Sequence, residues 1–310
     1  MSVYLGFDTS NYTTSAALFD SDTLTVRQKK QLLPVPAGAR GLRQSDCVFH
    51  HTVQLPPLAE RLLAAPVPVS AVCASDRPRM QEGSYMPCFL VGAGTGRITA
   101  KALGVPFYHT SHQHGHIVAA AFGAGRLDLL QSSFYAFHVS GGTTEAVLVQ
   151  PDRDELFSCT LVAQSLDLKA GQAIDRTGVM LGLQFPCGPA LEKLAAESDR
   201  TFHIRPTLKN GCPSLSGIEN QCQKMLKTGA PPADIAKFCL ESVAAALEKM
   251  AEALLETEKL PLLFAGGVMS NTMIRERFTA RFGAFFAPPA LSADNAAGTA
   301  IIGFLKHERE

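Results

Sequence analysis

A strand–turn–strand pattern occurs twice in the chain, at a fixed spacing of 130 residues. Residues 3–19 read as two antiparallel strands joined by a polar turn at residues 10–12, and residues 134–149 read the same way around a Gly-Gly turn. Aligned without a gap, residues 7–18 and 137–148 are identical at six of twelve positions. A similar hairpin at the start of each half of a chain predicts two related lobes.

Predicted strands and helices alternate after each hairpin. In the first half, helices are expected at residues 50–63, 94–103 and 111–122, and a strand at residues 69–74. In the second half, helices are expected at residues 171–181, 189–197 and 234–257, and a strand at residues 260–265. This alternation favours an α/β fold with mixed, largely parallel sheets covered by helices. We expect a first lobe of residues 1–128 and a second of residues 129–294, with a last helix within residues 295–310 that packs back on the first lobe.

The composition excludes several classes of protein. Apolar residues make up 46% of the chain and charged residues 18%, which is enough apolar material for two buried cores and excludes a disordered chain. The 28 basic and 28 acidic residues balance, so attraction to nucleic acid would need a local basic patch. No apolar stretch reaches the roughly 18–20 residues of a membrane span, and the start does not resemble a signal peptide. The eight cysteines form no CxxC pair, so we expect free thiols in a cytoplasmic protein.

Small polar turns follow three predicted strands, at residues 8–10, 140–142 and 265–268. Glycine in such a turn lets backbone N–H groups come close to phosphate oxygens. One Gly-Gly pair is more often an ordinary tight turn, but three such turns, two of them in the duplicated hairpins, favour a nucleotide site. The glycines at residues 92–96 fit neither the P-loop nor the GxGxxG pattern.

Four of the nine histidines fall within eight residues, at His109, His112, His114 and His116. On a helix, His112 and His116 share one face and can chelate one ion, whereas His114 points elsewhere and His109 could lie one turn earlier. Asp294 is the best candidate for a third ligand, although an aspartate just before a helix also serves as an N-cap. Two histidines and a carboxylate suit one divalent metal, Fe²⁺ or Zn²⁺, with Mn²⁺ or Mg²⁺ as alternatives.

Several motifs together resemble the TsaD family of tRNA threonylcarbamoyladenosine synthases, formerly called glycoproteases, and the resemblance runs end to end. The family's His-x-x-Gly-His motif appears at residues 112–116, its Val-Ser-Gly-Gly at 139–142 and its Gly-x-Ala-x-Asp at 171–175. Its Gly-Leu-x-Tyr-Pro-Gly-Gly-Pro resembles residues 182–189, and its late nucleotide loop matches residues 265–271.

The resemblance implies a two-lobed actin-like ATPase fold of the ribonuclease H-like type, with duplicated mixed sheets. It implies transfer of threonylcarbamoyl from threonylcarbamoyl-AMP to N6 of adenosine 37 in tRNA, with ATP or threonylcarbamoyl-AMP as ligand. It also implies tRNA and proteins of the threonylcarbamoyl synthesis machinery, or a second copy in a homodimer, as partners. The residues implied for the nucleotide and substrate are Ser140, Gly141, Gly142, Asp175, Gly188, Gly266, Gly267 and Asn271. The residues implied for the metal are His112, His116 and Asp294.

The chain departs from the family in its first turn, where the family has Ser-Cys-Asp-Glu-Thr and this sequence has Ser-Asn-Tyr-Thr-Thr at residues 10–14. The acidic pair is missing, so we assign the catalytic role to Ser10 and to a relocated acid, Asp8 or Asp167. Thr143 also replaces the histidine that usually follows Ser-Gly-Gly.

These departures leave a second hypothesis open, a metal- and nucleotide-binding paralogue that regulates or scaffolds and modifies no tRNA. A basic rim formed by Arg77, Arg79, Arg97 and Lys101 would favour tRNA binding instead. A metalloprotease, as the old family name suggests, is disfavoured because no general-base glutamate adjoins the histidines.

Overall fold

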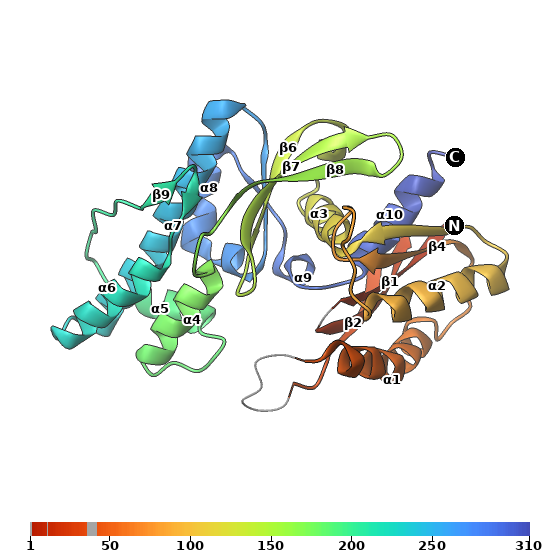
Figure 1. The fold of residues 1–310 in the computed structure, drawn as a ribbon, viewed down its shortest axis with the longest axis horizontal. Helices are drawn as coiled ribbons and strands as arrows, with labels where there is room; N and C mark the ends of the chain where they lie inside the picture. Colours follow the sequence, from red (N-terminus) through yellow and green to blue (C-terminus); the bar gives the residue numbers. More distant parts are fainter. Residues whose placement is uncertain (1, 11, 36–41) are drawn as a thin grey trace. The chain divides into compact units, whose positions relative to one another are not determined.

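The computed structural model describes residues 2–10, 12–35 and 42–310, and its ribbon is drawn in Figure 1. The chain forms two compact units: a first unit of Met1–Leu127, Asp152–Ser158 and Ala290–Glu310, and a second unit of Asp128–Pro151 and Cys159–Pro289. The first unit includes residues 152–158 and 290–294, which the sequence analysis had grouped with the second lobe. Contacts within the first unit explain this, because Glu155 pairs with Lys306 at 2.7 Å and Phe157 stacks on His114.

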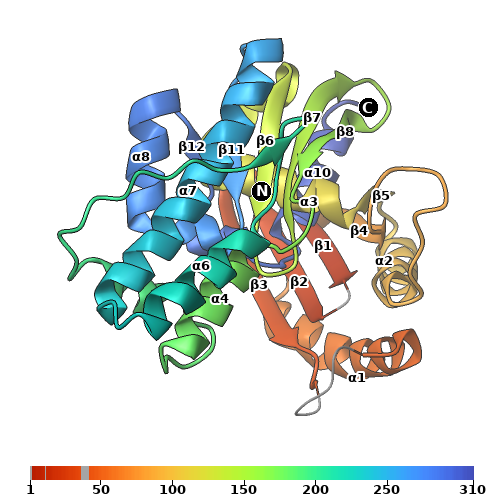
Figure 2. The same cartoon turned by 60° about the vertical axis from the view of Figure 1, so that its left-hand side comes forward.

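The first unit is built on a five-stranded sheet in the order β3-β2-β1-β4-β5. Its strands are β1 Val3–Ser10, β2 Thr13–Asp20, β3 Thr25–Leu32, β4 Val69–Arg77 and β5 Phe107–Ser111. Its helices are α1 Gln44–Leu62, α2 Phe89–Leu103, α3 His112–Gly123 and α10 Ala297–His307. The first three strands are antiparallel to one another, and β4 and β5 run parallel to β1. Figure 2 shows β1, β2 and β3 side by side, with α1 beside them.

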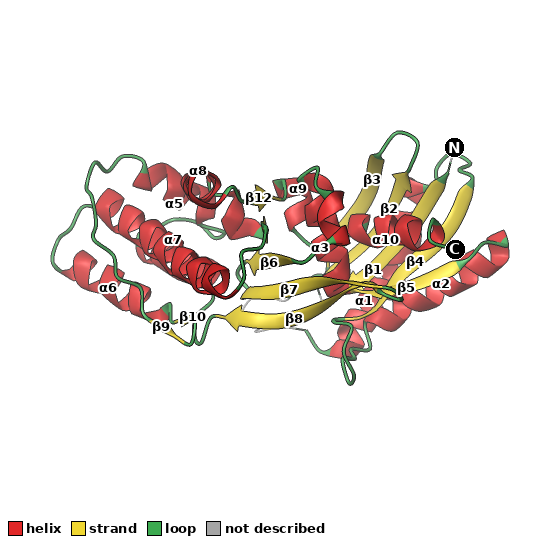
Figure 3. Ribbon diagram, turned by 90° about the horizontal axis from the view of Figure 1, so that it is seen from above, coloured by secondary structure: helices red, strands yellow, loops and turns green. Residues whose placement is uncertain are grey.

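Alternate residues of β1 and β2 point to opposite faces of this sheet and pack against different helices. Leu5 and Phe7 join a buried cluster with residues of α1 and α2. On the other face, Tyr4 and Phe19 pack against Phe304 of α10 at ring distances of 5.3 Å. Helices α1 and α2 therefore cover one face and α10 the other (Figure 3).

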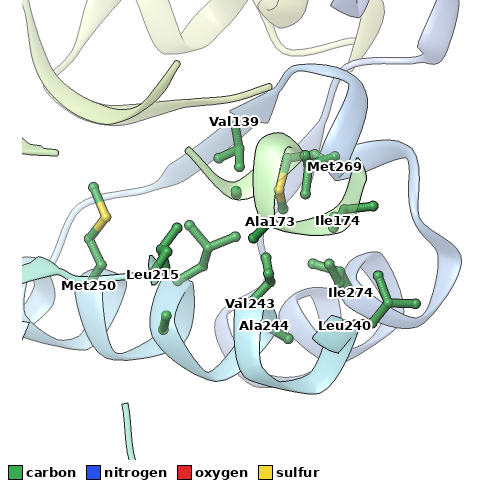
Figure 4. Close-up of a cluster of buried hydrophobic side chains, with 14 of the residues drawn as sticks. Val139, Ala173, Ile174, Leu215, Leu240, Val243, Ala244, Met250, Met269 and Ile274 are labelled. Carbon is green, nitrogen blue, oxygen red and sulfur yellow. The ribbon is translucent and has the colours of Figure 1, made fainter. Parts of the chain in front are cut away.

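The second unit repeats this plan with a sheet in the order β12-β11-β6-β7-β8. Its strands are β6 Phe134–Val139, β7 Thr144–Asp152, β8 Leu156–Gln164, β11 Leu262–Ala265 and β12 Phe285–Phe286, although Asp152 and residues 156–158 are grouped with the first unit. Its helices are α4 Ala170–Met180, α5 Gly188–Ala195, α6 Ser216–Lys227, α7 Pro232–Thr257 and α8 Thr272–Phe282. A large buried cluster joins the sheet to α4 and α7, and Figure 4 shows Val139, Ile174 and Val243 within it.

Shorter elements complete the chain. They are the 3₁₀ segments η1 Leu127–Gln131 and η2 Gly267–Ser270, the two-residue strands β9 Leu208–Lys209 and β10 Cys212–Pro213, and the short helix α9 Pro289–Ser292. No described helix combines the length and the apolar content that a membrane span requires.

The two hairpins have the same pairing register, so the prediction of duplicated mixed sheets is confirmed. Phe7 pairs with Ala16 in β1 and β2, and Phe137 pairs with Ala146, 130 residues later, in β6 and β7. In each sheet the first strand of the hairpin then pairs in parallel with a later strand, β4 in one and β11 in the other. The turn predicted at residues 10–12 contains Asn11, which lies outside the described residues.

Two local predictions were wrong. His109 lies in β5 and not one helical turn before His112, because α3 begins only at His112 and is capped by the Ser111 hydroxyl, which accepts from His114 N at 3.2 Å. Helix α1 begins at Gln44, six residues before the expected start, and runs through two internal prolines.

Helices α3 and α10 approach each other closely at two glycines. A Cβ built on Gly298 of α10 would collide with the carbonyl oxygen of Gly115 and lie 2.9 Å from Ala119 N of α3. The obstacles are backbone atoms, which cannot rotate away. Glycine at residue 298 therefore sets the spacing between the two helices.

We predict that Gly298→Ala lowers the free energy of unfolding by about 1–3 kcal/mol, because the added methyl group overpacks this contact. Gly94→Ala in α2 is the matched control, since a Cβ there meets nothing within 4 Å. That control should stabilise the protein by about 0.5–1 kcal/mol, because alanine favours the helix. Thermal and urea unfolding followed by circular dichroism measures both changes, and equal stabilities for the two variants would contradict the prediction.

Candidate metal and nucleotide sites

Three predicted metal ligands converge in the first unit. His112 and His116 lie one turn apart on α3, and Asp294 lies in the segment that leads into α10. His116 Nε2 is 3.0 Å from His112 Nε2 and 3.2 Å from Asp294 Oδ1, and His112 Nε2 is 3.6 Å from that same oxygen. Among the described residues, these three form the cluster with the donor atoms of a metal site.

The donor spacing fits a small divalent cation. Ligands about 2.1 Å from a tetrahedral zinc ion lie about 3.4 Å from one another, within the range that the three donor atoms span. The set of two imidazoles and one carboxylate, with coordination positions left for other ligands, suits Zn²⁺ or Fe²⁺.

Asp8 is hydrogen-bonded to Nδ1 of His112, the ring nitrogen that does not face the other two residues of the cluster. Asp8 Oδ2 accepts hydrogen bonds from His112 Nδ1 at 2.9 Å and from the Ser75 hydroxyl at 2.6 Å, and Oδ1 accepts from Ser10 N at 3.0 Å. A hydrogen on Nδ1 leaves the lone pair of Nε2 to face the other two ligands. Asp8 thus fixes the orientation of His112, and both oxygens of Asp8 accept hydrogen bonds.

The carboxylates around His112 stabilise its protonated, positively charged form. Burial alone would lower the pKa of His112, but attraction to Asp8 and hydrogen bonds with Asp294 and Asp8 raise that pKa to about 10. Burial would likewise raise the pKa of Asp294, but hydrogen bonds and charge from the two imidazoles hold the pKa of this carboxyl well below its usual range. Protons and a metal cation therefore compete for the same nitrogen atoms.

The side chain of Asp294 does not cap α10. The amide of Ala297 donates to the side chain of Asn295 at 2.9 Å, and Asp294 Oδ2 instead accepts from the Thr13 hydroxyl at 3.2 Å. His114 is buried and engaged elsewhere, with its ring nitrogens 2.8 Å from the Ser111 hydroxyl and 2.8 Å from the Phe157 carbonyl oxygen. His114 therefore lies outside the cluster, as its position on the helix predicts.

The second unit contains a cavity of about 340 Å³ beside α4, α5 and the start of α8. Its lining residues are Gly141, Gly171, Ile174, Asp175, Pro186, Gly188, Pro189, Glu192, Leu240, Gly267, Val268, Ser270 and Asn271. Five of the eight residues assigned to the nucleotide are among them. The close approach of α4 to the turn at Gly141 requires glycine at residue 171, because a Cβ there would lie 2.6 Å from Gly141 N.

The other three assigned residues have structural contacts beside the cavity. The Ser140 hydroxyl accepts from the amides of Gly142 and Thr143, at 3.3 and 3.1 Å, and so closes its own turn. Gly266 has φ +102° and packs against the carbonyl of Val139, next to Gly267 in the lining.

Two carboxylates face the same cavity, and sequence reasoning missed one of them. Asp175 Oδ1 accepts from Cys187 N at 2.8 Å, and Glu192 Oε1 accepts from Thr272 N at 2.6 Å. Each carboxylate is thus anchored to the backbone through one oxygen. The described lining contains no lysine or arginine, so a phosphate there would depend on backbone N–H groups, whereas the two carboxylates suit the hydroxyl groups of a sugar. The sequence feature that could have indicated Glu192 is its spacing of one helical turn from Gly188, which is a predicted nucleotide residue.

Of the two remaining residues with predicted catalytic roles, Asp167 is held by hydrogen bonds and Ser10 is buried. Asp167 Oδ1 accepts from the amides of Leu168 and Leu215, at 2.6 and 2.7 Å, and Oδ2 accepts from the Ser216 hydroxyl at 2.6 Å. Burial would raise the pKa of Asp167, but these hydrogen bonds lower it. The Ser10 hydroxyl is buried and has no hydrogen-bond partner among the described residues.

Solved structures at low sequence identity show the class of fold. Full-length HypF, in a phosphate- and nucleotide-bound form, aligns with a TM-score of 0.60 at 12% identity, covering 98% of this chain and 55% of that one. Component A of (R)-2-hydroxyglutaryl-CoA dehydratase from Acidaminococcus fermentans aligns with a TM-score of 0.55 at 15% identity, covering 99% and 100%. At these identities the likeness concerns the fold alone, which is the two-lobed α/β fold of actin-like ATPases.

The family follows from the sequence. The model of the TsaD family, described as tRNA N6-adenosine threonylcarbamoyltransferase, matches residues 41–301, and the chain belongs to this family. A relative of that name from Thermus thermophilus is 32% identical over 98% of this chain and 93% of its own length. One from Methanopyrus kandleri is 29% identical over 93% and 83%.

We predict that Asp8→Asn weakens zinc binding by about 10- to 100-fold, because loss of the carboxylate behind a metal-binding histidine loosens its orientation and reduces its basicity. His116→Ala should abolish binding, and Ser75→Ala should have a smaller effect than Asp8→Asn. Competition with a zinc-chelating dye measures the affinity of each variant, and circular dichroism checks that it is folded. Wild-type affinity in Asp8→Asn would contradict the positioning role.

Proposed function

We propose that this protein transfers a threonylcarbamoyl group from threonylcarbamoyl-AMP to N6 of adenosine 37 in tRNA. Family membership supports this reaction, and the observation that favours it for this chain is the convergence of His112, His116 and Asp294. The proposal includes action in the cytoplasm, together with other proteins of threonylcarbamoyl synthesis.

In this proposal the cavity of the second unit takes the adenosine part of the ligand. The free oxygens of Asp175 and Glu192 accept hydrogen bonds from the ribose hydroxyls, since the other oxygen of each is held by a backbone amide. The backbone at Gly141 and Gly142 contacts the phosphate or carbamate oxygens, and the loop from Gly267 to Asn271 contacts the base. Asn271 is fixed for this role because its side chain caps α8, accepting from Ile274 N at 3.0 Å.

His112, His116 and Asp294 would hold the divalent metal, and Asp8 would orient His112. A bound cation supplies charge that can orient and polarise ligand oxygens. Both carboxylates proposed as a relocated general base are engaged in structural hydrogen bonds, Asp8 with His112 and Asp167 at the start of α6. The base that assists the attacking amine is therefore expected from a partner protein or from the tRNA.

A second candidate function is a paralogue that binds metal and nucleotide and regulates or scaffolds without modifying tRNA. The observation that favours it is the chemistry of the two turns, where Tyr12 and Thr13 stand in place of the family's acidic pair and Thr143 in place of its histidine. Threonine hydroxyls remain protonated at neutral pH and cannot act as general bases.

We predict that Asp175→Asn and Glu192→Gln each weaken binding of ATP and of adenosine by a similar factor, about 10- to 100-fold, because a ribose contact is independent of phosphate. Lys193→Gln is the matched control, since Lys193 is exposed on α5 and lies outside the cavity lining. Isothermal titration calorimetry measures both ligands. A loss confined to ATP would place these carboxylates at the phosphate end and overturn the assignment.

We also predict that the isolated protein transfers labelled threonylcarbamate to an ANN-reading tRNA about 10²- to 10⁴-fold more slowly than it does with the host's other threonylcarbamoyl synthesis proteins. That range is the usual loss when one general-base contact is missing. Fast transfer by the isolated protein would disprove the dependence on a partner. No transfer in any combination, with ATP still bound, would favour the regulatory paralogue.

A further inference from the structure

The sequence has one stretch of strong charge asymmetry. Residues 23–45 contain five basic residues and no acidic residue, whereas the whole chain has 28 of each. The rest of the chain therefore has 23 basic and 28 acidic residues, a net charge of −5. Three of the five cations, Arg27, Lys29 and Lys30, fall within four residues of one strand.

That strand, β3, forms the edge of the first unit's sheet (Figure 2). It pairs with β2 on one side only, and six of its eight residues are exposed. None of the three cations forms an ion pair with a carboxylate within the described part of the chain. Some other cations of the described chain do form ion pairs, such as Arg277 with Glu248 and Arg176 with Glu219.

The register places the cations on both faces of the strand. Arg27 and Lys29 pair with Leu18 and Ala16 and share their face, whereas Lys30 pairs with Ser15 on the face of Asp8. The ammonium group of Lys30 donates to the backbone carbonyl of Asp294 at 3.2 Å. Lys30 thus lies beside the segment that contains Asp294, whereas Arg27 and Lys29 extend from the opposite face of the edge strand.

We propose that β3 is a contact surface for the phosphate backbone of RNA. This inference rests on the proposed function, which requires an RNA substrate close to the metal ligands. Unpaired lysine and arginine side chains on an exposed strand attract a polyanion through release of its counterions. Such contacts fix the position of an RNA without reading its bases. An acidic protein segment is the competing occupant of such a surface.

The test compares tRNA binding by the full chain and by the double variant Arg27→Gln/Lys29→Gln between 50 and 300 mM salt (about the range where phosphate contacts dominate). Lys30 is left intact because of its contact with Asp294. The control, Lys224→Gln/Lys227→Gln, removes the same charge from exposed positions on α6. Fluorescence anisotropy of labelled tRNA gives the affinities, and ATP and zinc binding verify that each variant is folded.

We expect Arg27→Gln/Lys29→Gln to reduce the slope of log affinity against log salt by about 1.4–1.8, which corresponds to two lost phosphate contacts, and to lower affinity about 10- to 50-fold at 0.1 M salt. The control should change neither the slope nor the affinity.

An unchanged slope in the β3 variant, while the wild-type protein binds tRNA, would overturn this inference and leave the proposed function standing. Failure of the wild-type protein to bind tRNA, with ATP and zinc still bound, would overturn the proposed function as well. Loss of binding to a polyglutamate peptide but not to tRNA would identify an acidic protein partner instead.

Discussion

The backbone contact between α3 and α10 is the constraint on which the metal cluster depends. Without a side chain on Gly298, the two helices approach until backbone meets backbone. The histidines lie at the start of one helix and Asp294 lies three residues before the other, so this approach brings donors 178 residues apart to within 3.2 Å. Helix packing in this unit thus brings the three donor groups together.

The two units provide different chemistry on the same framework. In the first, the end of β1 carries Asp8, and the nearby groups are imidazoles and carboxylates arranged around one point. In the second, the equivalent turn carries glycines, and the cavity beside it presents backbone and two anchored carboxylates. A carboxylate held by a backbone amide keeps one oxygen directed toward a ligand at little entropic cost, which is useful for recognising a sugar.

Much of this arrangement could be predicted from the sequence, because it depends on local periodicity. The hairpins repeat the same pattern, and His112 and His116 have helical spacing, so both features are local. The roles of Asp8 and Asp167 could not be predicted in this way, because their hydrogen-bond partners, Ser75 and Leu215, are 67 and 48 residues away. Glu192 was missed because one glutamate on an amphipathic helix looks like an ordinary surface residue. The placement of residues 152–158 depends on the contact between Glu155 and Lys306, which are 151 residues apart in the sequence.

The shared register of the two hairpins bears on how the chain diversified. Asp8 and His138 occupy equivalent positions 130 residues apart, as do Ser10 and Ser140, yet the two residues that follow the serine differ, Asn-Tyr in one turn and Gly-Gly in the other. The strand pairing has been kept while the turns have changed, because a slip of one residue would exchange the two faces of a strand. After an internal duplication, each copy could lose the groups that the other retained. An internal duplication followed by separate changes in each turn would account for this pattern.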